Sequence, residues 1–270
     1  MKFCLLLSLQ FSLCTISYAW TGLAVDLVGP TTKDQVECLR VNNYTAIFSR
    51  VYYDNTFDMD SLTTINNAAA TGIGLEPLFI PDILSKIPAK TQIMNLYNAL
   101  NDYNIKIQRL WVQVRDQNQW MATPFGLQQN VDFFNETIYT ARNLTWKIGV
   151  FTTKQDWQTI MGNWAGQDFY QSAANLWYTN TTGNGTSGET TQDFSDFTNF
   201  GIWSTSGNTM PNVKQFGVNE NVCNLTVNRN FYYFPDNLPF YSVRIGENSE
   251  NLNMINHARH FKARIVKPKA

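Results

Sequence analysis

The sequence predicts an α/β protein built as a single β/α barrel of the TIM type, with some irregularity in its last strands. Short apolar runs alternate with longer amphipathic segments along most of the chain. Strands buried on both faces, with helices between them, indicate a parallel sheet. A length of 270 residues suits one closed barrel. No glycine-rich phosphate loop follows the first apolar run, which disfavours a doubly wound nucleotide-binding sheet.

Each predicted strand is a short apolar run that turn-forming residues end. The first covers residues 23–28, and Gly29 and Pro30 end it. Similar runs predict strands at residues 45–51, 74–80, 107–114, 147–152 and 175–178, and two shorter ones near 213–216 and 222–227. Residues 179–192 are rich in Thr, Asn and Gly and lack apolar periodicity, which predicts a long surface loop.

Apolar residues spaced three or four positions apart predict helices between these strands. Thr31 or Thr32 is expected to cap the first helix. Asp60 is expected to cap the second, which has Ala69 on its inner face and ends at Gly72. Further helices are predicted over residues 89–102, 128–142, 155–161 and 247–261.

The two ends of the chain predict a division into three parts. Residues 1–19 combine Lys2, an apolar stretch and the small-residue pattern Ser17-Tyr18-Ala19, which is typical of a secretory signal peptide. That stretch is too short for a membrane span, and no second one follows. We therefore expect a secreted protein without a transmembrane segment, with a barrel domain over residues 20–246 and a C-terminal helix and basic tail over 247–270.

The composition excludes several classes of function. Charged residues make up 15% of the chain and the formal net charge is -1, whereas a nucleic-acid binder would carry a basic surface. The two histidines, His257 and His260, lie near the end of the chain. The barrel itself therefore has no histidine for a His-based triad or a three-His metal site. We expect the two histidines to be solvent-exposed and to bind no metal. We expect no metal, no cofactor and a monomer.

Without the signal peptide the chain keeps two cysteines, Cys38 and Cys223. An even pair in an oxidising compartment predicts a disulfide that ties an early helix to a late strand, and two unrelated buried thiols are the alternative. Six positions match the Asn-x-Ser/Thr rule for N-glycosylation: Asn43, Asn135, Asn143, Asn180, Asn184 and Asn224.

Barrels place their chemistry at the carboxyl ends of their strands. Asp26 lies near that end of the first strand, where a carboxylate is costly unless it is paired or hydrogen-bonded. We predict a catalytic or ligand-binding acid, and a structural acid that caps a helix or pairs with an Arg is the alternative. Glu76, early in the third strand, is expected to form an ion pair in the barrel floor with Arg109 or Arg50.

The fourth strand places Trp111, Gln113 and Arg115 on one face by strand alternation. Neither an amide nor a guanidinium serves as a general acid at neutral pH. Asp116, just beyond the strand, is the candidate for a relocated acid.

The ordered combination of short motifs over about residues 22–233 resembles the family 25 glycoside hydrolases, the Chalaropsis-type lysozymes, and within them the nematode lysozyme-like branch. The motifs are Gly22-Leu23-Ala24-Val25-Asp26, Trp111-Val112-Gln113-Val114 with Trp120, Ile148-Gly149-Val150-Phe151-Thr152 with Trp157, Leu176-Trp177-Tyr178, Lys214-Gln215-Phe216, Val222-Cys223 and Val227-Asn228-Arg229-Asn230.

The resemblance implies a lysozyme fold from which most catalytic acids are missing. Asp26 matches the family's first-strand Asp. Gln113 and Arg115 stand where the family has Asp-x-Glu, and Asn228 stands where it has an Asp. The implied function is antibacterial defence by acting on or binding bacterial peptidoglycan, outside the cell or in the lumen of lysosome-related compartments. An active muramidase that uses Asp26 with a relocated acid is the alternative.

The predicted ligand contacts follow from the same positions. Trp111 and Trp177 are expected to line the cleft and stack on sugar rings. Gln113, Arg115 and Asn228 are expected to hydrogen-bond amides or carboxylates of the ligand, and Arg115 suits a bidentate carboxylate contact.

Overall fold

The computed structural model describes residues 20–166, 175–203, 210–234 and 243–245. The predicted signal peptide, the predicted helix at 247–261 and the basic tail lie outside the described residues. Among the described residues, no helix has both the length and the apolar character that crossing a bilayer requires.

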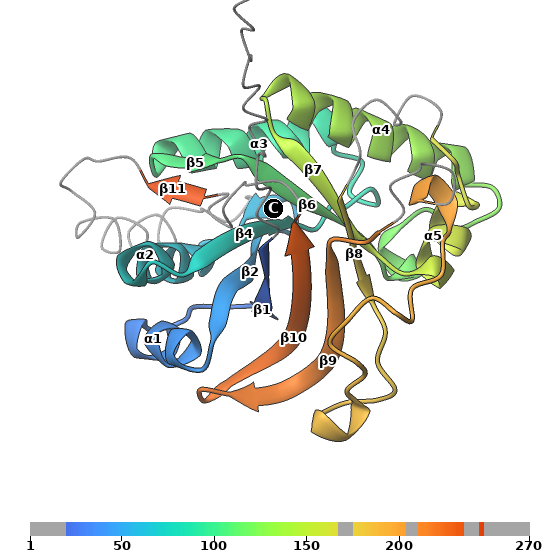
Figure 1. Cartoon of the computed structure of the whole chain (residues 1–270). Coiled ribbons are helices and arrows are strands. Elements are labelled where there is room, and N and C mark those ends of the chain that lie inside the picture. Colours follow the sequence, from blue (N-terminus) through green and yellow to red (C-terminus); the bar gives the residue numbers. More distant parts are fainter. Residues whose placement is uncertain (1–19, 167–174, 204–209, 235–242, 246–270) are drawn as a thin grey trace, which may run out of the picture.

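The central element is one mixed sheet that closes into a barrel (Figure 1). The strands of this sheet are β1 (Trp20–Leu27), β2 (Tyr44–Tyr53), β3 (Thr56–Phe57), β4 (Gly74–Phe79), β6 (Arg109–Val114), β7 (Lys147–Thr152), β8 (Asn175–Thr179), β9 (Val213–Val222) and β10 (Leu225–Phe234). Their order is β1-β10-β9-β8-β7-β6-β4-β2-β3, and pairing of β1 with β2 closes the ring. The predicted β/α barrel is confirmed.

The predicted irregularity also lies where it was expected, in the last strands. β10 runs antiparallel to both β9 and β1, whereas the pairs from β1 through β2, β4, β6, β7 and β8 to β9 are parallel. Both final strands are longer than the sequence predicted. Their outer parts pair with each other in a projecting hairpin, so they lack the continuous apolar pattern of a strand buried on both faces.

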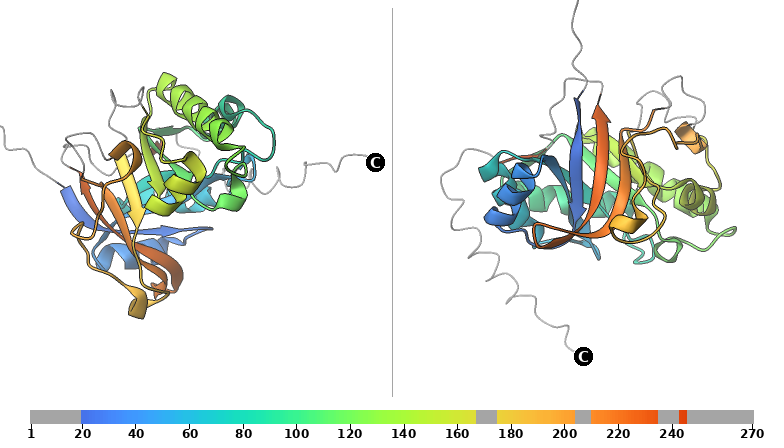
Figure 2. Two further views of the ribbon diagram at one scale, coloured as in Figure 1. Left: turned by 90° about the vertical axis from the view of Figure 1, so that its right-hand side faces the viewer. Right: turned by 60° about the horizontal axis from the view of Figure 1, so that its bottom comes forward.

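In the described part of the chain, five α-helices pack on the outside of the barrel, and the apolar faces they share with the strands form the larger core. They are α1 (Lys33–Val41), α2 (Ser61–Thr71), α3 (Ala89–Asp102), α4 (Leu127–Asn143) and α5 (Lys154–Met161). Figure 2 shows that no α-helix of the described chain covers the face made by β1, β10 and β9. That face is instead approached by the loop after β8, whose Gly185 N–H donates to the Val218 carbonyl at 2.7 Å.

The local signals at the helix ends were mostly correct. Thr32 caps α1, and its hydroxyl accepts from the Gln35 N–H while the Gln35 side chain accepts from the Thr32 N–H. Gly72 ends α2 in the left-handed conformation that glycine permits. Asp60 occupies the predicted N-cap position of α2, but its side chain makes no capping hydrogen bond. The expected inward position of Ala69 was wrong, because Ala69 is exposed and Ala68 is buried.

The predicted strand at 107–114 is two strands, β5 (Ile105–Ile107) and β6. β5 leaves the barrel and pairs antiparallel with β11 (Val243–Ile245), which forms a second small sheet. The Cys38–Cys223 disulfide is also present, and it joins α1 to the turn between β9 and β10.

The barrel interior is filled by a second, smaller apolar cluster that includes Trp111, Phe151 and Trp177. Gly149 makes room for Trp111, because a Cβ there would lie 2.2 Å from Cε3 of its indole. The predicted Glu76 ion pair is confirmed with Arg109: Arg109 Nη1 lies 3.2 Å from Glu76 Oε1, and Trp111 Nε1 donates to Glu76 Oε2 at 2.8 Å.

Candidate functional site

Asp26 lies at the carboxyl end of β1 and is only 9% exposed. Three amide groups donate hydrogen bonds to its carboxylate. Asn228 Nδ2 donates to Oδ1 at 2.7 Å, while Gln215 Nε2 and Asn230 Nδ2 each donate to Oδ2 at 2.8 Å. The site is therefore a buried carboxylate in which both oxygens are engaged.

The antiparallel strand β10 makes this arrangement possible. Asn228 is the direct register partner of Asp26, and Asn230, two residues further along, faces the same side. Gln215 comes from β9, where it pairs with Thr179 of β8 and with Asn230. The hairpin of β9 and β10, near the end of the described chain, thus brings three amides to Asp26 on the first strand.

A second hydrogen bond fixes the orientation of each amide. The Asn230 side-chain oxygen accepts from Trp177 Nε1 at 2.9 Å, and that of Gln215 accepts from Thr179 Oγ1 at 2.9 Å. The Asn228 oxygen accepts from the Asn219 N–H at 3.0 Å. Because each amide oxygen already has a donor, each NH₂ group is directed at the carboxylate.

The environment of Asp26 acts on its pKa in two opposing ways. Burial raises the pKa of the carboxyl above its ordinary value, and this is the largest influence. The hydrogen bonds from Asn230, Gln215 and Asn228 and the positive charge of Arg115 act in the opposite direction and lower it. The hydrogen-bond partners of Asp26 in the described chain are amides, so it has no carboxyl group beside it with which to share a proton.

Gln113 lies near the end of β6 and Arg115 directly follows the strand, and both are partly exposed at the barrel mouth. The Arg115 guanidinium lies 4.7 Å from the centre of the Phe151 ring, and its Nε is 3.6 Å from Asp156 Oδ2. Phe151 in turn stacks on Trp177 with their centres 3.8 Å apart. Arg115 is thus the outer layer of a stack, and its side chain is 30% exposed.

The structure places both predicted stacking tryptophans differently. Trp111 and Trp177 are fully buried in the barrel interior, where their indole N–H groups bond to Glu76 and Asn230. Their rings fill the barrel and pack edge-to-face on each other, so neither ring has a face open to the cleft.

Asp116 is exposed and uses its carboxylate within its own turn. It accepts hydrogen bonds from both the N–H and the side-chain amide of Asn118 at 3.1 Å. This contact caps the short 3-10 turn Gln117–Gln119. The structure gives Asp116 a capping role and no contact with Asp26.

Two residues of the amide set, Gln215 and Asn230, were not predicted. A signal for Asn230 existed, because it lies two residues after Asn228 in the motif Val227-Asn228-Arg229-Asn230, directly after the predicted strand at 222–227. Gln215 gave none, because its approach to Asp26 depends on the register between β9 and β10.

A second charged cluster lies where the loop after β8 packs against β9 and β10. Arg229 Nη1 contacts the Glu189 carboxylate and lies 3.3 Å from Glu220 Oε2. Burial and the neighbouring Glu189 carboxylate raise the pKa of Glu220. Two carboxylates therefore share one guanidinium in a partly buried site.

The six sequons differ in exposure. The five asparagines that are exposed are Asn43, Asn143, Asn180, Asn184 and Asn224. Asn135 is half-buried within α4, and the hydroxyl of its sequon partner Thr137 is buried and donates to the Phe133 carbonyl. Glycosylation at each site stays a prediction.

The described fold has the shape of known lysozyme barrels. The structure of a muramidase from Acremonium alcalophilum superposes with a TM-score of 0.58 at 12% identity, covering 87% of this chain and 99% of that one. A family GH25 lysozyme from Aspergillus fumigatus gives 0.57 at 13% identity, covering 79% and 94%. LytC, a modular autolysin from Streptococcus pneumoniae solved with a synthetic peptidoglycan ligand, gives 0.54 at 11% identity, covering 79% of this chain and 47% of that one. The fold is thus that of the family 25 lysozymes.

Sequence similarity identifies the family more narrowly. Residues 17–216 match the family described as Lysozyme-like protein 1. Lysozyme-like protein 1 of Caenorhabditis elegans is 38% identical over 219 residues, which cover 80% of this chain and 69% of that protein. A probable GH family 25 lysozyme 2 of Dictyostelium discoideum is 27% identical over 86% of this chain and its own full length. The chain therefore belongs to the Lysozyme-like protein 1 family.

Proposed function

We propose that this protein is a secreted, lysozyme-like protein of antibacterial defence that binds bacterial peptidoglycan and does not cleave it. In this proposal Gln113 and Arg115 replace the catalytic carboxylate pair. The observation that carries it is the state of Asp26, whose two oxygens accept three hydrogen bonds from oriented amides. Hydrolysis of a glycoside needs a protonating acid and a second carboxylate placed across the bond.

The mouth suits binding better than cleavage. Arg115 offers a partly exposed guanidinium supported by Phe151 and Asp156, and such a group binds carboxylates in a fixed geometry. Gln113 adds a partly exposed amide that pairs with the peptide groups of a ligand. Asn228 already bonds to Asp26 and Asn219, and its second N–H and second oxygen lone pair serve the same kind of contact. Peptidoglycan carries both carboxylates and amides on its peptide stems. The solved relative LytC, with its peptidoglycan ligand, supports this choice of ligand class.

Secretion, or delivery to the lumen of lysosome-related compartments, belongs to the same proposal. The signal-like residues 1–19 and the Cys38–Cys223 disulfide support it, because disulfides persist in oxidising compartments. Detection of this chain in the medium of expressing cells, starting near Trp20, is the expected result. Retention in the cytosol with residue 1 intact would contradict it.

An active muramidase is the second candidate, and one observation favours it. Burial raises the pKa of Asp26, which is a property of a general acid. Under this alternative a carboxyl group elsewhere in the mouth supplies the second function.

Sedimentation with purified, insoluble peptidoglycan tests the proposed binding. We expect the protein to pellet with the walls, and we expect Arg115→Ala to weaken this binding roughly tenfold, the scale of one charge-assisted contact. Arg40→Ala is the matched control, because Arg40 is also an ion-paired arginine but lies on α1 with Glu37. Pelleting that is unchanged by Arg115→Ala, or equally weakened by Arg40→Ala, would contradict the proposal.

A further inference from the structure

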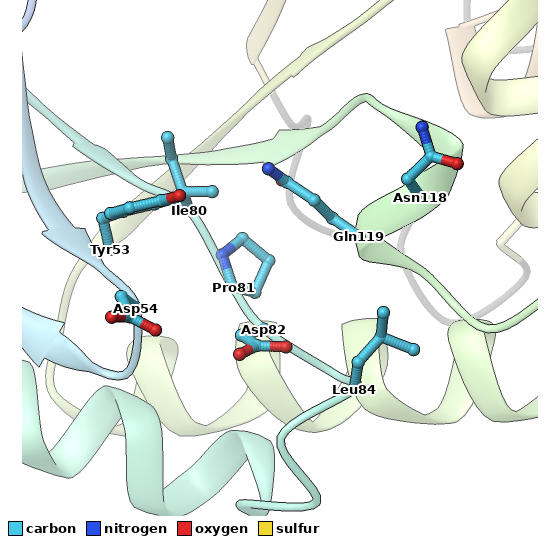
Figure 3. Close-up of a pocket in the computed structure, with 8 residues that line it drawn as sticks. All are labelled: Tyr53, Asp54, Ile80, Pro81, Asp82, Leu84, Asn118 and Gln119. Carbon is cyan, nitrogen blue, oxygen red and sulfur yellow. The ribbon is translucent and has the colours of Figure 1, made fainter.

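A pocket of about 140 Å³ opens beside the barrel mouth, between the ends of β2, β4 and β6 (Figure 3). Its walls come from the end of β2 and the following turn, from the loop after β4, and from the short turn after β6. The lining residues are Tyr53, Asp54, Ile80, Pro81, Asp82, Leu84, Asn118 and Gln119. None of the roles assigned above uses this pocket.

One part of the lining is an apolar surface open to solvent. Tyr53 is 43% exposed and Leu84 is 48% exposed, and Ile80 and Pro81 lie beside them. The guanidinium of Arg50 lies 4.5 Å from the centre of the Tyr53 ring. An exposed tyrosine next to aliphatic side chains suits the C–H face of a sugar ring.

The other part of the lining is polar and carries negative charge. Asp54 and Asp82 are both carboxylates, Asn118 and Gln119 are amides, and none of the lining residues is basic. Arg50, the cation beside Tyr53, is already paired with Asp58 at 2.8 Å. The pocket therefore favours a ligand that brings positive charge and hydrogen-bond donors.

The two carboxylates are available in different ways. Asp82 is held in place, because its oxygens accept from Asn55 Nδ2 at 2.8 Å and from the Ser85 N–H at 3.0 Å. Each carboxylate oxygen has a second lone pair that stays free for a ligand. Asp54 is exposed and makes no hydrogen bond or ion pair with another described residue.

The pocket shares the rim of the barrel with the proposed peptidoglycan site. Gln113 of β6 and Arg115, directly after this strand, lie at the mouth, and the short turn that follows supplies Asn118 and Gln119 to the pocket. The carboxyl ends of parallel barrel strands meet at one rim. A glycan chain held in the mouth can therefore place a further sugar ring in this pocket.

We propose that the pocket is a subsite for a hexosamine with a free, protonated amine, as in de-N-acetylated glycan strands. In this subsite the ring packs on Tyr53 and Leu84 and the ammonium group binds Asp54 and Asp82. This inference rests on the proposed function and specifies which chemical form of the glycan the site prefers.

Calorimetric titration with two oligosaccharides of equal length tests the subsite. The probes are a glucosamine tetramer with free amines and an N-acetylglucosamine tetramer, both at pH 6. We expect the wild-type protein to bind the free-amine tetramer at least about tenfold more tightly, the scale of one charge-assisted hydrogen bond. Equal affinity for the two tetramers would overturn the proposal.

Substitutions of the pocket acids test whether the preference for the free-amine tetramer arises in this pocket. Asp54→Asn removes no hydrogen bond or ion pair among the described residues, so it is expected to keep the fold while reducing the amine preference severalfold. Asp82→Asn is expected to remove most of it. Asp102→Asn, an exposed acid at the end of α3, is the control and is expected to keep it. A preference that survives both pocket substitutions would overturn the subsite.

The same variants separate this inference from the proposed function. Sedimentation with peptidoglycan that persists and depends on Arg115, in a protein without amine preference, would refute the pocket alone. Loss of peptidoglycan binding in the wild-type protein would refute the proposed function on which the pocket depends.

Discussion

Replacing Asn230 by Leu tests whether the amide set holds a buried carboxylate. The two side chains are similar in size, and Asn230 is fully buried. The substitution removes the 2.8 Å bond to Asp26 Oδ2 and the 2.9 Å bond from Trp177 Nε1. Asp26 loses one of three donors, and the indole N–H is left buried without a partner.

The expected cost follows from these two losses. A hydrogen bond to a charged group contributes about 1.5–3 kcal/mol, and an unpaired buried donor costs about 1–3 kcal/mol. Together they lower the free energy of unfolding by about 2.5–6 kcal/mol. At about 2–4 °C per kcal/mol for a domain of this size, the melting temperature falls by about 5–24 °C.

The cost should also depend on pH. Burial already raises the pKa of Asp26, and removal of a donor raises it further. A carboxyl whose pKa is raised in the folded state contributes stability that is present below its unfolded pKa and is lost as pH rises through the folded value. The deficit of Asn230→Leu against wild type is therefore largest near pH 7 and shrinks as pH falls toward 3.8, the ordinary value for Asp26.

Urea unfolding followed by tryptophan fluorescence, at pH 7 and near pH 4, measures both effects. Asn221→Leu is the matched control, because Asn221 is an exposed residue of β9. We expect the control to change stability by less than about 0.5 kcal/mol. A deficit for Asn230→Leu below about 1 kcal/mol at pH 7, or one that does not depend on pH, would refute this reasoning.

Three further predictions concern the rest of the barrel. Gly149→Ala should lower the free energy of unfolding by about 1–3 kcal/mol in a urea titration, because its Cβ would lie 2.2 Å from a buried indole carbon; an unchanged midpoint would contradict this packing. Glu220→Gln should raise the urea midpoint at pH 7 but not near pH 4, because burial and Glu189 raise the pKa of Glu220 and its ionisation destabilises the fold; a stabilisation that is equal at both pH values would count against it. Loss of the Cys38–Cys223 disulfide, by Ser at both positions, should cost about 2–5 kcal/mol in the same titration, and a cost below 1 kcal/mol would show that the link adds little.

Much of the fold could be predicted because each helix carries its own signal. Residues 89–102 have apolar side chains at helical spacing, and α3 has exactly these bounds. The final strands were less predictable. β9 and β10 are buried on both faces only inside the barrel, and beyond it polar residues such as Asn219 and Asn221 interrupt the apolar pattern.

The residues of the candidate site also differ in how well the sequence predicts their positions. Asp26, Gln113 and Arg115 could be placed at the mouth because strand alternation and strand direction fix where such residues point. Gln215 and Asn230 could not be placed, because their contact with Asp26 requires the antiparallel register of β10 against β1 and β9. Alternation also put Trp111 on the inner face of the barrel, but it gave no measure of how deeply that ring is buried.

The release of reducing ends from purified peptidoglycan shows whether the protein hydrolyses the glycan or only binds it. The wild-type protein is incubated with cell walls from pH 3 to pH 8, beside Asp26→Asn and an active lysozyme as positive control. Binding without hydrolysis predicts no reducing ends above the buffer blank at any pH, while the protein still pellets with the walls. Reducing ends that appear with the wild-type protein and disappear with Asp26→Asn would contradict the account and establish a muramidase.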